Sequence, residues 1–163
     1  MEDDRLRIPV DGDYVASLGR AAYVFAVMEW NAVWCCELLD DGYLNELGRK
    51  TAGAIAEDFA RLAALHPDPG IRSELTDAAE AFRLLVRVRN LLLHGKPGTA
   101  PGGNQMLFDR GRAWTPELID AAADDFAQCC AELNRILYDR LGGPVSGREA
   151  AAGQVSPRTR PRP

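Results

Sequence analysis

Residues 71–97 read IRSELTDAAEAFRLLVRVRNLLLHGKP and have the spacing of one long amphipathic helix. Apolar side chains recur every three or four residues, which is the period of an α-helix. Gly95 is the expected C-cap, and Pro97 cannot continue a helix. We therefore predict a helix from Ile71 to His94. One arginine lies on its apolar stripe, which consists of Ile71, Leu75, Ala78, Phe82, Leu85, Val86, Arg89, Leu92 and Leu93.

The same periodicity predicts three more helices, at Asp13–Leu39, Thr51–Leu65 and Thr115–Leu141. The first is apolar on nearly every side, so we expect it to be the central element. The last has the clearest start, with Thr115 as N-cap and Pro116 at the first helical position. The sum is an all-α protein, a four-helix up-down bundle.

Two segments do not follow this pattern. Residues 95–113 are rich in Gly and Pro, and their one apolar stretch, Met106–Phe108, predicts a short strand of a β-hairpin or a clamp over the bundle. Residues 144–163 have no periodicity and hold four arginines against one glutamate, a net charge of +3. We expect a helical domain at 1–143 and a disordered basic tail at 144–163, either a solvated terminus or a contact for RNA or acidic partners.

Composition limits the classes of function. The 163 residues are 47% hydrophobic and 26% charged, as in a soluble globular protein, and the net charge of -5 excludes a protein that binds polyanions over its whole surface. The cysteines form two adjacent pairs, Cys35-Cys36 and Cys129-Cys130, which fit neither a disulfide framework nor a metal motif and are expected in the core. With an acidic N-terminus and no apolar run of about 18 residues, we expect a cytoplasmic protein without membrane contact.

The candidate chemistry lies at the end of the helix that ends at His94. A guanidinium on an apolar stripe, such as that of Arg89, requires a partner such as a carboxylate, a carbonyl or a phosphate. Asn90 follows it directly, and His94 stands in the last turn. A histidine can exchange the proton of an RNA 2′-hydroxyl, and an arginine can stabilise charge on the phosphate. This chemistry needs no metal or other cofactor, and the histidines lack acidic neighbours at ligand spacing.

An arginine followed by a polar residue and, five positions after the arginine, a histidine at the end of a long helix resembles the signature of the HEPN superfamily (higher eukaryotes and prokaryotes nucleotide-binding domains). Many members are metal-independent endoribonucleases of toxin–antitoxin, abortive-infection or RNA-processing systems. The resemblance implies Arg89, Asn90 and His94 as catalytic residues, a homodimer, and an antitoxin or defence-system partner. Arg61 and His66 have the same spacing, but Leu62 replaces the polar residue and His66 precedes a proline.

Alternatives stay open at this stage. Some HEPN proteins keep the fold and only bind nucleotides, RNA or partners, and Arg89 can be a buried ion-pair partner while His94 caps a helix end. Glu29 and Asn31 lie inside the apolar first helix. We expect Glu29 to pair with Arg89 or to orient it, and Asn31 to satisfy a nearby polar group.

A local basic surface beside His94 is the expected RNA track. Its cations are Arg83, Arg87, Lys96, Arg110 and Arg112. The alternative is a solvated face on which Arg83 pairs with Glu80. A helical dimer unrelated to RNA is a further alternative, and Trp30 and Trp34 of the first helix are the expected dimer contact.

Overall fold

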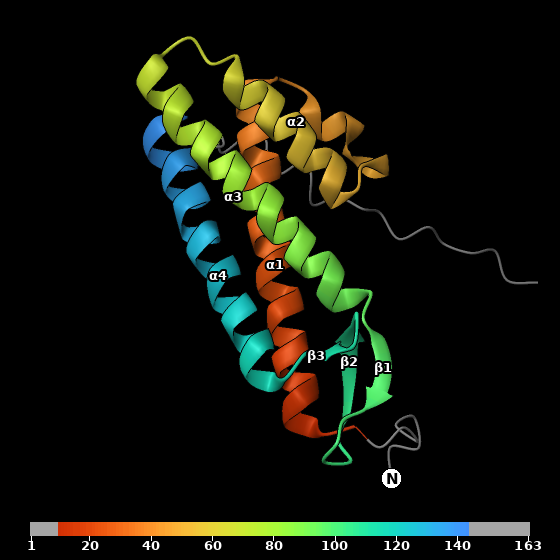
Figure 1. Cartoon of the computed structure of the whole chain (residues 1–163). Coiled ribbons are helices and arrows are strands. Elements are labelled where there is room, and N and C mark those ends of the chain that lie inside the picture. Colours follow the sequence, from red (N-terminus) through yellow and green to blue (C-terminus); the bar gives the residue numbers. More distant parts are fainter. Residues whose placement is uncertain (1–9, 144–163) are drawn as a thin grey trace, which may run out of the picture.

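The structure, a computed structural model, describes residues 10–143. The protein is mainly α-helical, as predicted, with a small antiparallel sheet (Figure 1). The elements in chain order are α1 (Gly12–Leu39), the 3-10 helix η1 (Tyr43–Arg49), α2 (Ala52–Ala64), α3 (Pro69–Leu93), β1 (Lys96–Thr99), β2 (Gln105–Asp109), β3 (Arg112–Ala113), α4 (Pro116–Arg135) and the π-type helix η2 (Ile136–Arg140). The predicted basic tail at 144–163 lies outside the described residues, as do residues 1–9.

Side-chain caps set the helix starts. Asp68 accepts hydrogen bonds from the backbone N–H groups of Gly70 and Ile71 at 2.8 and 2.9 Å, so α3 begins two residues before the predicted Ile71. Thr115 caps α4 through the N–H of Leu118, as predicted. Proline occupies the first turn of both helices, where its missing N–H costs nothing.

Four buried phenylalanines, one from each α-helix, lie in the core: Phe25, Phe59, Phe82 and Phe126. The rings of Phe25 and Phe126 meet edge to face, with centroids 5.3 Å apart. In Figure 1, α4 runs beside α1 and α3 crosses in front of it, and the most extensive helix contacts are α1 with α4 and α2 with α3. α1 has many buried residues and contacts α2, α3 and α4, but its apolar side chains are not buried on every side, since Tyr23, Val27 and Trp30 are exposed.

Buried cysteines fill part of this core, as predicted. Cys35, Cys36 and Cys129 are buried, and Cys130 is half-buried. Burial raises the pKa of Cys36 to about 12 and that of Cys129 to about 11. These thiols therefore act as small apolar groups rather than nucleophiles. Within residues 10–143, α1 alone has the length and mean hydropathy (1.2) of a membrane-spanning helix, a property that central helices of globular proteins share.

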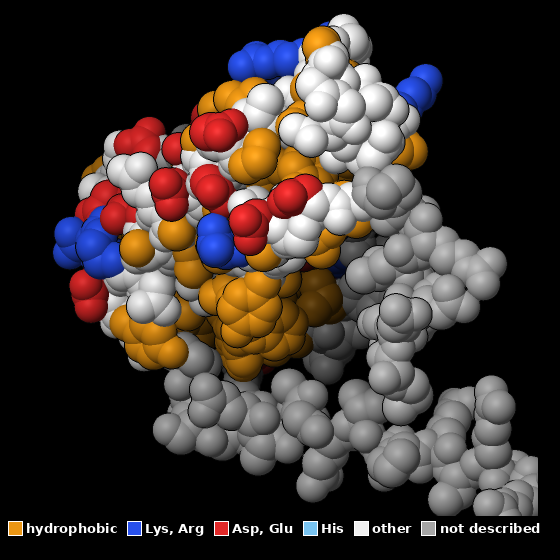
Figure 2. Space-filling model, turned by 90° about the horizontal axis from the view of Figure 1, so that it is seen from below, with side chains coloured by type: hydrophobic (Ala, Val, Ile, Leu, Met, Phe, Trp, Pro, Cys, Tyr) orange, Lys and Arg blue, Asp and Glu red, His pale blue; other side chains and the backbone are white. Residues whose placement is uncertain are grey.

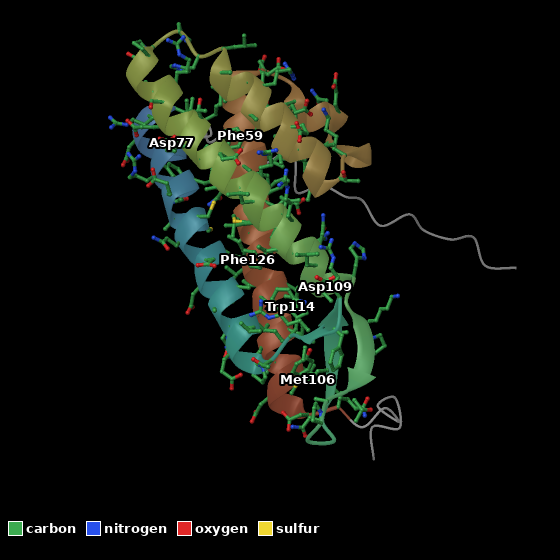
Figure 3. All side chains as sticks on the ribbon, viewed as in Figure 1. Phe59, Asp77, Met106, Asp109, Trp114 and Phe126 are labelled. Atoms are coloured by element: carbon green, nitrogen blue, oxygen red, sulfur yellow. The ribbon has the colours of Figure 1, made fainter. Side chains whose placement is uncertain are left out.

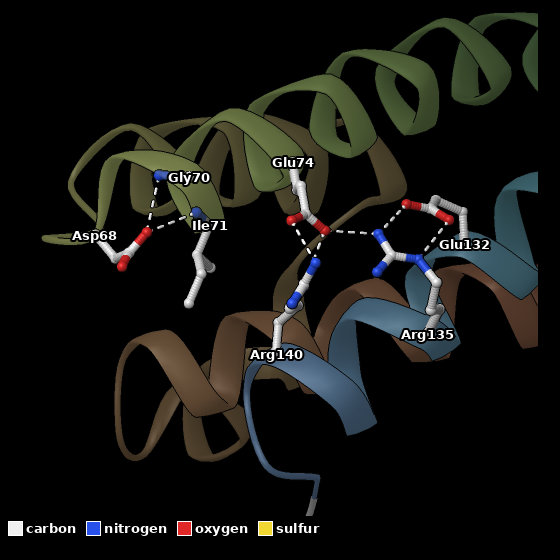
Figure 4. Close-up of polar contacts among 7 residues, drawn as sticks. All are labelled: Asp68, Gly70, Ile71, Glu74, Glu132, Arg135 and Arg140. Carbon is white, nitrogen blue, oxygen red and sulfur yellow. Dashed lines mark hydrogen bonds and ion pairs between the residues drawn. The ribbon is translucent and has the colours of Figure 1, made fainter.

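A network of ion pairs joins the first half of α3 to the end of α4 and to η2 (Figure 4). Glu74 on α3 accepts hydrogen bonds from Arg135 at 2.7 Å and from Arg140 at 3.1 Å. Arg135 also donates to Glu132, one turn before it. These hydrogen bonds lower the pKa of Glu74 below its usual range.

Residues 95–113 form a three-stranded antiparallel sheet in the order β1-β2-β3, more than the predicted loop or hairpin. β1 pairs with β2 from Lys96 opposite Phe108 to Thr99 opposite Gln105, and Asp109 pairs with Arg112 across the second turn. The phenol oxygen of Tyr14 on α1 accepts the N–H of Leu107 at 2.8 Å and ties the sheet to the first turns of α1. The sheet lies below the end of α3 (Figure 1).

The predicted role of Gly95 as C-cap is corrected. His94 is the C-cap of α3, and Gly95 is not among the glycines with positive φ. A Cβ at Gly95 would lie 2.9 Å from Cβ of Leu107. A glycine is therefore required because β2 passes close to the backbone at this point.

Candidate functional site

Arg89 points into the protein, as its place on the apolar stripe predicts. It is half-buried, and its guanidinium carbon lies 5.2 Å from the centroid of the Phe25 ring on α1, within the range of a cation–π contact. Its Nε atom is buried and has no hydrogen-bond partner among the described residues. A buried N–H without an acceptor is costly, so Arg89 is only partly satisfied by the folded chain.

Asn90 connects the other two motif residues. Its side-chain oxygen accepts a hydrogen bond from the guanidinium of Arg89 at 2.9 Å. Its backbone oxygen accepts the N–H of His94 at 3.0 Å, within the last turn of the helix. The side chain of Asn90 therefore orients Arg89, while the only hydrogen bond between Asn90 and His94 among the described residues is this backbone one.

His94 is exposed at the end of α3. It follows Arg89 by five residues, which at about 100° per residue places the two positions about 140° apart around the helix axis. Arg89 faces α1 and His94 faces solvent, with Asn90 between them. The three residues share one helix end, but they do not share one face.

The carboxylate of Glu29 is near enough to Arg89 to feel its charge but does not contact it. It is half-buried, and burial raises its pKa, while the nearby cation of Arg89 lowers the pKa in part. The expected ion pair between them is not formed: no pair between Glu29 and Arg89 within 4.0 Å occurs among the ion pairs of residues 10–143. Asn90, rather than Glu29, orients Arg89.

Asn31 serves the packing of α1 on α4. Its side-chain nitrogen donates to the backbone oxygen of Cys130 at 3.2 Å. This hydrogen bond satisfies the half-buried amide, as expected for a polar group in an apolar helix. It does not bring Asn31 to Arg89.

The predicted cations separate into two groups. Arg83 forms two hydrogen bonds of 2.9 Å to Glu80 on its own helix, which is the alternative of a solvated ion pair. Arg87, Lys96, Arg110 and Arg112 are exposed. No ion pair within the described part of the chain holds these four.

The sheet register carries two of these cations to the end of α3. Lys96 lies opposite Phe108 in the antiparallel pair, so the turn Arg110-Gly111 comes just beyond the level of His94. Asp109, at this end of β2, is drawn beside the lower end of α3 in Figure 3. The register therefore brings the Arg110-Gly111 turn to the end of α3 that carries His94.

A pocket that the sequence did not predict lies beside these residues. Its volume is about 330 Å³, and it is formed by α3, the β2–β3 hairpin and α4. Its walls include Val88, Leu91, Asp109, Arg112, Trp114 and Asp125. Among residues 10–143, no group of three or more His, Cys, Asp or Glu side chains is placed to hold a metal ion.

A second, shallower hollow of about 450 Å³ lies between α1 and α4. It is lined mostly by apolar side chains, among them Tyr23, Val27 and Ala131. Tyr23 is 72% exposed and Trp30 is 43% exposed, whereas Trp34 is buried. Seen from below, hydrophobic side chains gather in a continuous patch on one side of the protein (Figure 2).

Comparisons of the chain with protein-family models, with curated proteins and with solved structures found no match.

Proposed function

We propose that this protein is a metal-independent endoribonuclease of HEPN type, with a HEPN-like four-helix up-down bundle, that cleaves single-stranded or looped RNA. The observation that carries the proposal is the end of α3, where Arg89, oriented by Asn90, precedes an exposed His94 beside the cations of the β2–β3 turn. In cleavage by a 2′-hydroxyl, a histidine can transfer the protons and an arginine can stabilise the charge on the phosphate.

The proposed reaction is a transesterification within the RNA. The 2′-oxygen forms a bond to phosphorus and gives up its proton, the bond from phosphorus to the 5′-oxygen breaks, and this oxygen takes up a proton. His94 exchanges these protons, and Arg89 donates hydrogen bonds to the phosphate oxygens. The products are a 2′,3′-cyclic phosphate and a 5′-hydroxyl. Arg87, Lys96, Arg110 and Arg112 attract the RNA backbone.

The proposed assembly is a cytoplasmic homodimer that acts in a toxin–antitoxin or phage-defence system, with an inhibitory partner protein. The exposed apolar face of α1, which we define as Tyr23, Val27 and Trp30, supports a dimer. These side chains are 72%, 39% and 43% exposed, which is unusual for large apolar groups that gather on one helix face.

A non-catalytic dimer that binds RNA or a partner protein is the second candidate. The observation in its favour is that Arg89 and His94 occupy different faces of α3. A phosphate held by Arg89 would then lie away from the imidazole, and binding would occur without cleavage.

Incubation of the purified protein with structured and unstructured RNA in a chelator tests the proposal. We expect cleavage with cyclic phosphate ends, and its loss in His94→Ala. His66→Ala is the matched control, because His66 also follows an arginine, Arg61, by five residues. His66 lies just before the start of α3, at the opposite end from His94. Cleavage that survives His94→Ala refutes the site, cleavage that requires magnesium refutes the mechanism, and binding without cleavage supports the second candidate.

A further inference from the structure

The pocket between α3, the β2–β3 hairpin and α4 has the size and lining of a small-ligand site. Its volume of about 330 Å³ is at the lower end of the range for such sites, which suits a single nucleoside better than a peptide. Val88 and Leu91 of α3 supply an apolar wall, and half-buried Trp114 supplies an aromatic one. An aromatic side chain in an apolar pocket is the usual platform for an unpaired nucleobase.

The charged side chains that line the pocket have no hydrogen-bond or ion-pair partners within residues 10–143. Asp109 and Arg112 face each other as a cross-strand pair, yet neither makes a side-chain hydrogen bond or ion pair to another described residue. Asp125 of α4 adds an exposed carboxylate to the half-buried one of Asp109. A carboxylate only accepts hydrogen bonds, and a guanidinium only donates them. The pocket therefore offers paired acceptors and a separate donor to a ligand.

The pocket lies next to the proposed cleavage site. Leu91 in its wall is four residues after Arg87 and three residues before His94, and residues at these spacings are neighbours on a helix surface. Arg112 in the pocket lining follows the Arg110-Gly111 turn, which the sheet register brings to the end of α3 that carries His94. A nucleotide whose base enters the pocket therefore has its phosphate close to Arg87 and His94.

We propose that this pocket binds a guanine base and selects the nucleotide at the cleaved bond; this rests on the proposed nuclease function. Guanine presents two adjacent donors, N1–H and the 2-amino group, which match the two oxygens of Asp109, and its O6 accepts from Arg112. Adenine and cytosine place a ring acceptor beside their amino group, and uracil flanks its N–H with two carbonyls. These bases leave a carboxylate facing an acceptor, which is repulsive.

Binding of the four nucleoside 3′-monophosphates to the full chain, measured by calorimetry, tests the pocket without any cleavage. We expect guanosine 3′-monophosphate to bind at least tenfold more tightly than the other three. Asp109→Asn should remove this preference, and Asp124→Asn, an exposed carboxylate on α4 outside the pocket, should keep it. Ala121→Trp fills the pocket from an exposed position and should abolish binding even if a polar variant alters the hairpin.

The outcomes separate this inference from the proposed function. Equal binding of the four nucleotides, absence of nucleotide binding, or an unchanged guanine preference in Asp109→Asn overturns the guanine site. If RNA is cleaved in a His94-dependent way but without preference for guanosine, the nuclease stands and the guanine site falls. If guanosine 3′-monophosphate binds as expected and no RNA is cleaved, the pocket stands and the nuclease falls.

Discussion

The side-chain oxygen of Asn90 accepts a hydrogen bond from the guanidinium of Arg89, its immediate neighbour in the sequence. Adjacent residues on a helix point about 100° apart, so this contact bends the long arginine side chain around α3. The Phe25 ring supports the guanidinium from α1. Asn90 is thus a positioning residue for Arg89.

Asn90→Ala should lower kcat/KM for RNA cleavage by about tenfold, because one hydrogen bond to a charged group contributes about 1.5 kcal/mol. Asn90→Asp retains an acceptor and should rescue most of the loss. Single-turnover kinetics with a defined RNA measure the effect, and the pH profile should keep its shape because His94 is unchanged. Equal losses in both variants would show that the amide acts on the substrate rather than on Arg89.

Glu29→Gln should make the protein more stable at neutral pH. Burial raises the pKa of Glu29 in the folded protein. The folded state is therefore favoured while Glu29 is protonated, and this stabilisation is lost as the pH rises from the ordinary glutamate pKa, about 4.3, through the raised pKa of the folded state. Urea unfolding at pH 3 and at pH 7 should show no difference from the parent protein at the lower pH and a gain at the higher pH. The gain should be larger in an Arg89→Met background, because the compensating cation is absent. An equal gain in both backgrounds would show that the two residues do not interact.

Arg110→Asn should stabilise the chain and weaken RNA binding together. Arg110 has a φ of 47°, and among residues 10–143 it alone combines a positive φ with a side chain. Asparagine tolerates this conformation, and its introduction should raise the stability by about 1 kcal/mol and the Tm by about 3 °C. In a plot of the logarithm of the binding constant for single-stranded RNA against the logarithm of the salt concentration, the slope should become less steep by about 0.7, the value for one phosphate contact.

Gly111→Ala is the control for Arg110→Asn, since Gly111 has a φ of 83° in the same turn. It should lower the Tm without removing a cation. An Arg110→Asn protein that is more stable and binds RNA normally would show that Arg110 makes no contact with RNA.

Glu74→Gln should lower the Tm near neutral pH because Glu74 joins α3 to Arg135 and Arg140 (Figure 4). Its pKa is lowered, so its stabilising effect is present above the ordinary glutamate range and is lost as the pH falls through the lowered pKa. In calorimetric scans from pH 7 to below pH 4, the Tm of Glu74→Gln should therefore approach the Tm of the parent protein as the pH falls. Glu80→Gln, which cuts a pair within α3 alone, should have the smaller effect. A larger effect of Glu80→Gln would contradict a role of Glu74 in holding the helices together.

Tyr23→Glu combined with Trp30→Glu should convert the proposed dimer into a monomer. Both side chains are exposed in the single chain, so their charge should disrupt an interface without unfolding the protein. Sedimentation velocity measures the change. Leu65→Glu, at an equally exposed leucine at the end of α2, should leave the dimer intact. A parent protein that sediments as a monomer at all concentrations rules out this dimer.

Local signals predicted the helices well. Thr115 caps α4 and the apolar stripe of α3 faces the core, because caps and periodicity depend on residues close in sequence. The apolar period begins only at Ile71, whereas the Asp68 cap starts α3 two residues earlier, at Pro69. Helix η1 is short and has no side-chain cap at its start, so no local signal of the kind used for the α-helices marks it.

The site depended on contacts that the sequence does not encode locally. The inward direction of Arg89 follows from its stripe, but the packing of α1 on α3 sets Phe25, rather than Glu29, against the guanidinium. The register of β1 against β2 brings the Arg110 turn to His94, and two distant elements join α3 to form the pocket around Trp114. Such placements depend on the packing of distant segments.

The close packing of Gly95 against Leu107 fixes one end of the β1–β2 hairpin to α3, while residues 100–104 at its opposite end are mostly exposed. A fluorophore or affinity peptide inserted after Gly102 would thus report on the protein in living cells while keeping clear of the imidazole. Length variation among natural variants should accumulate at that same remote bend.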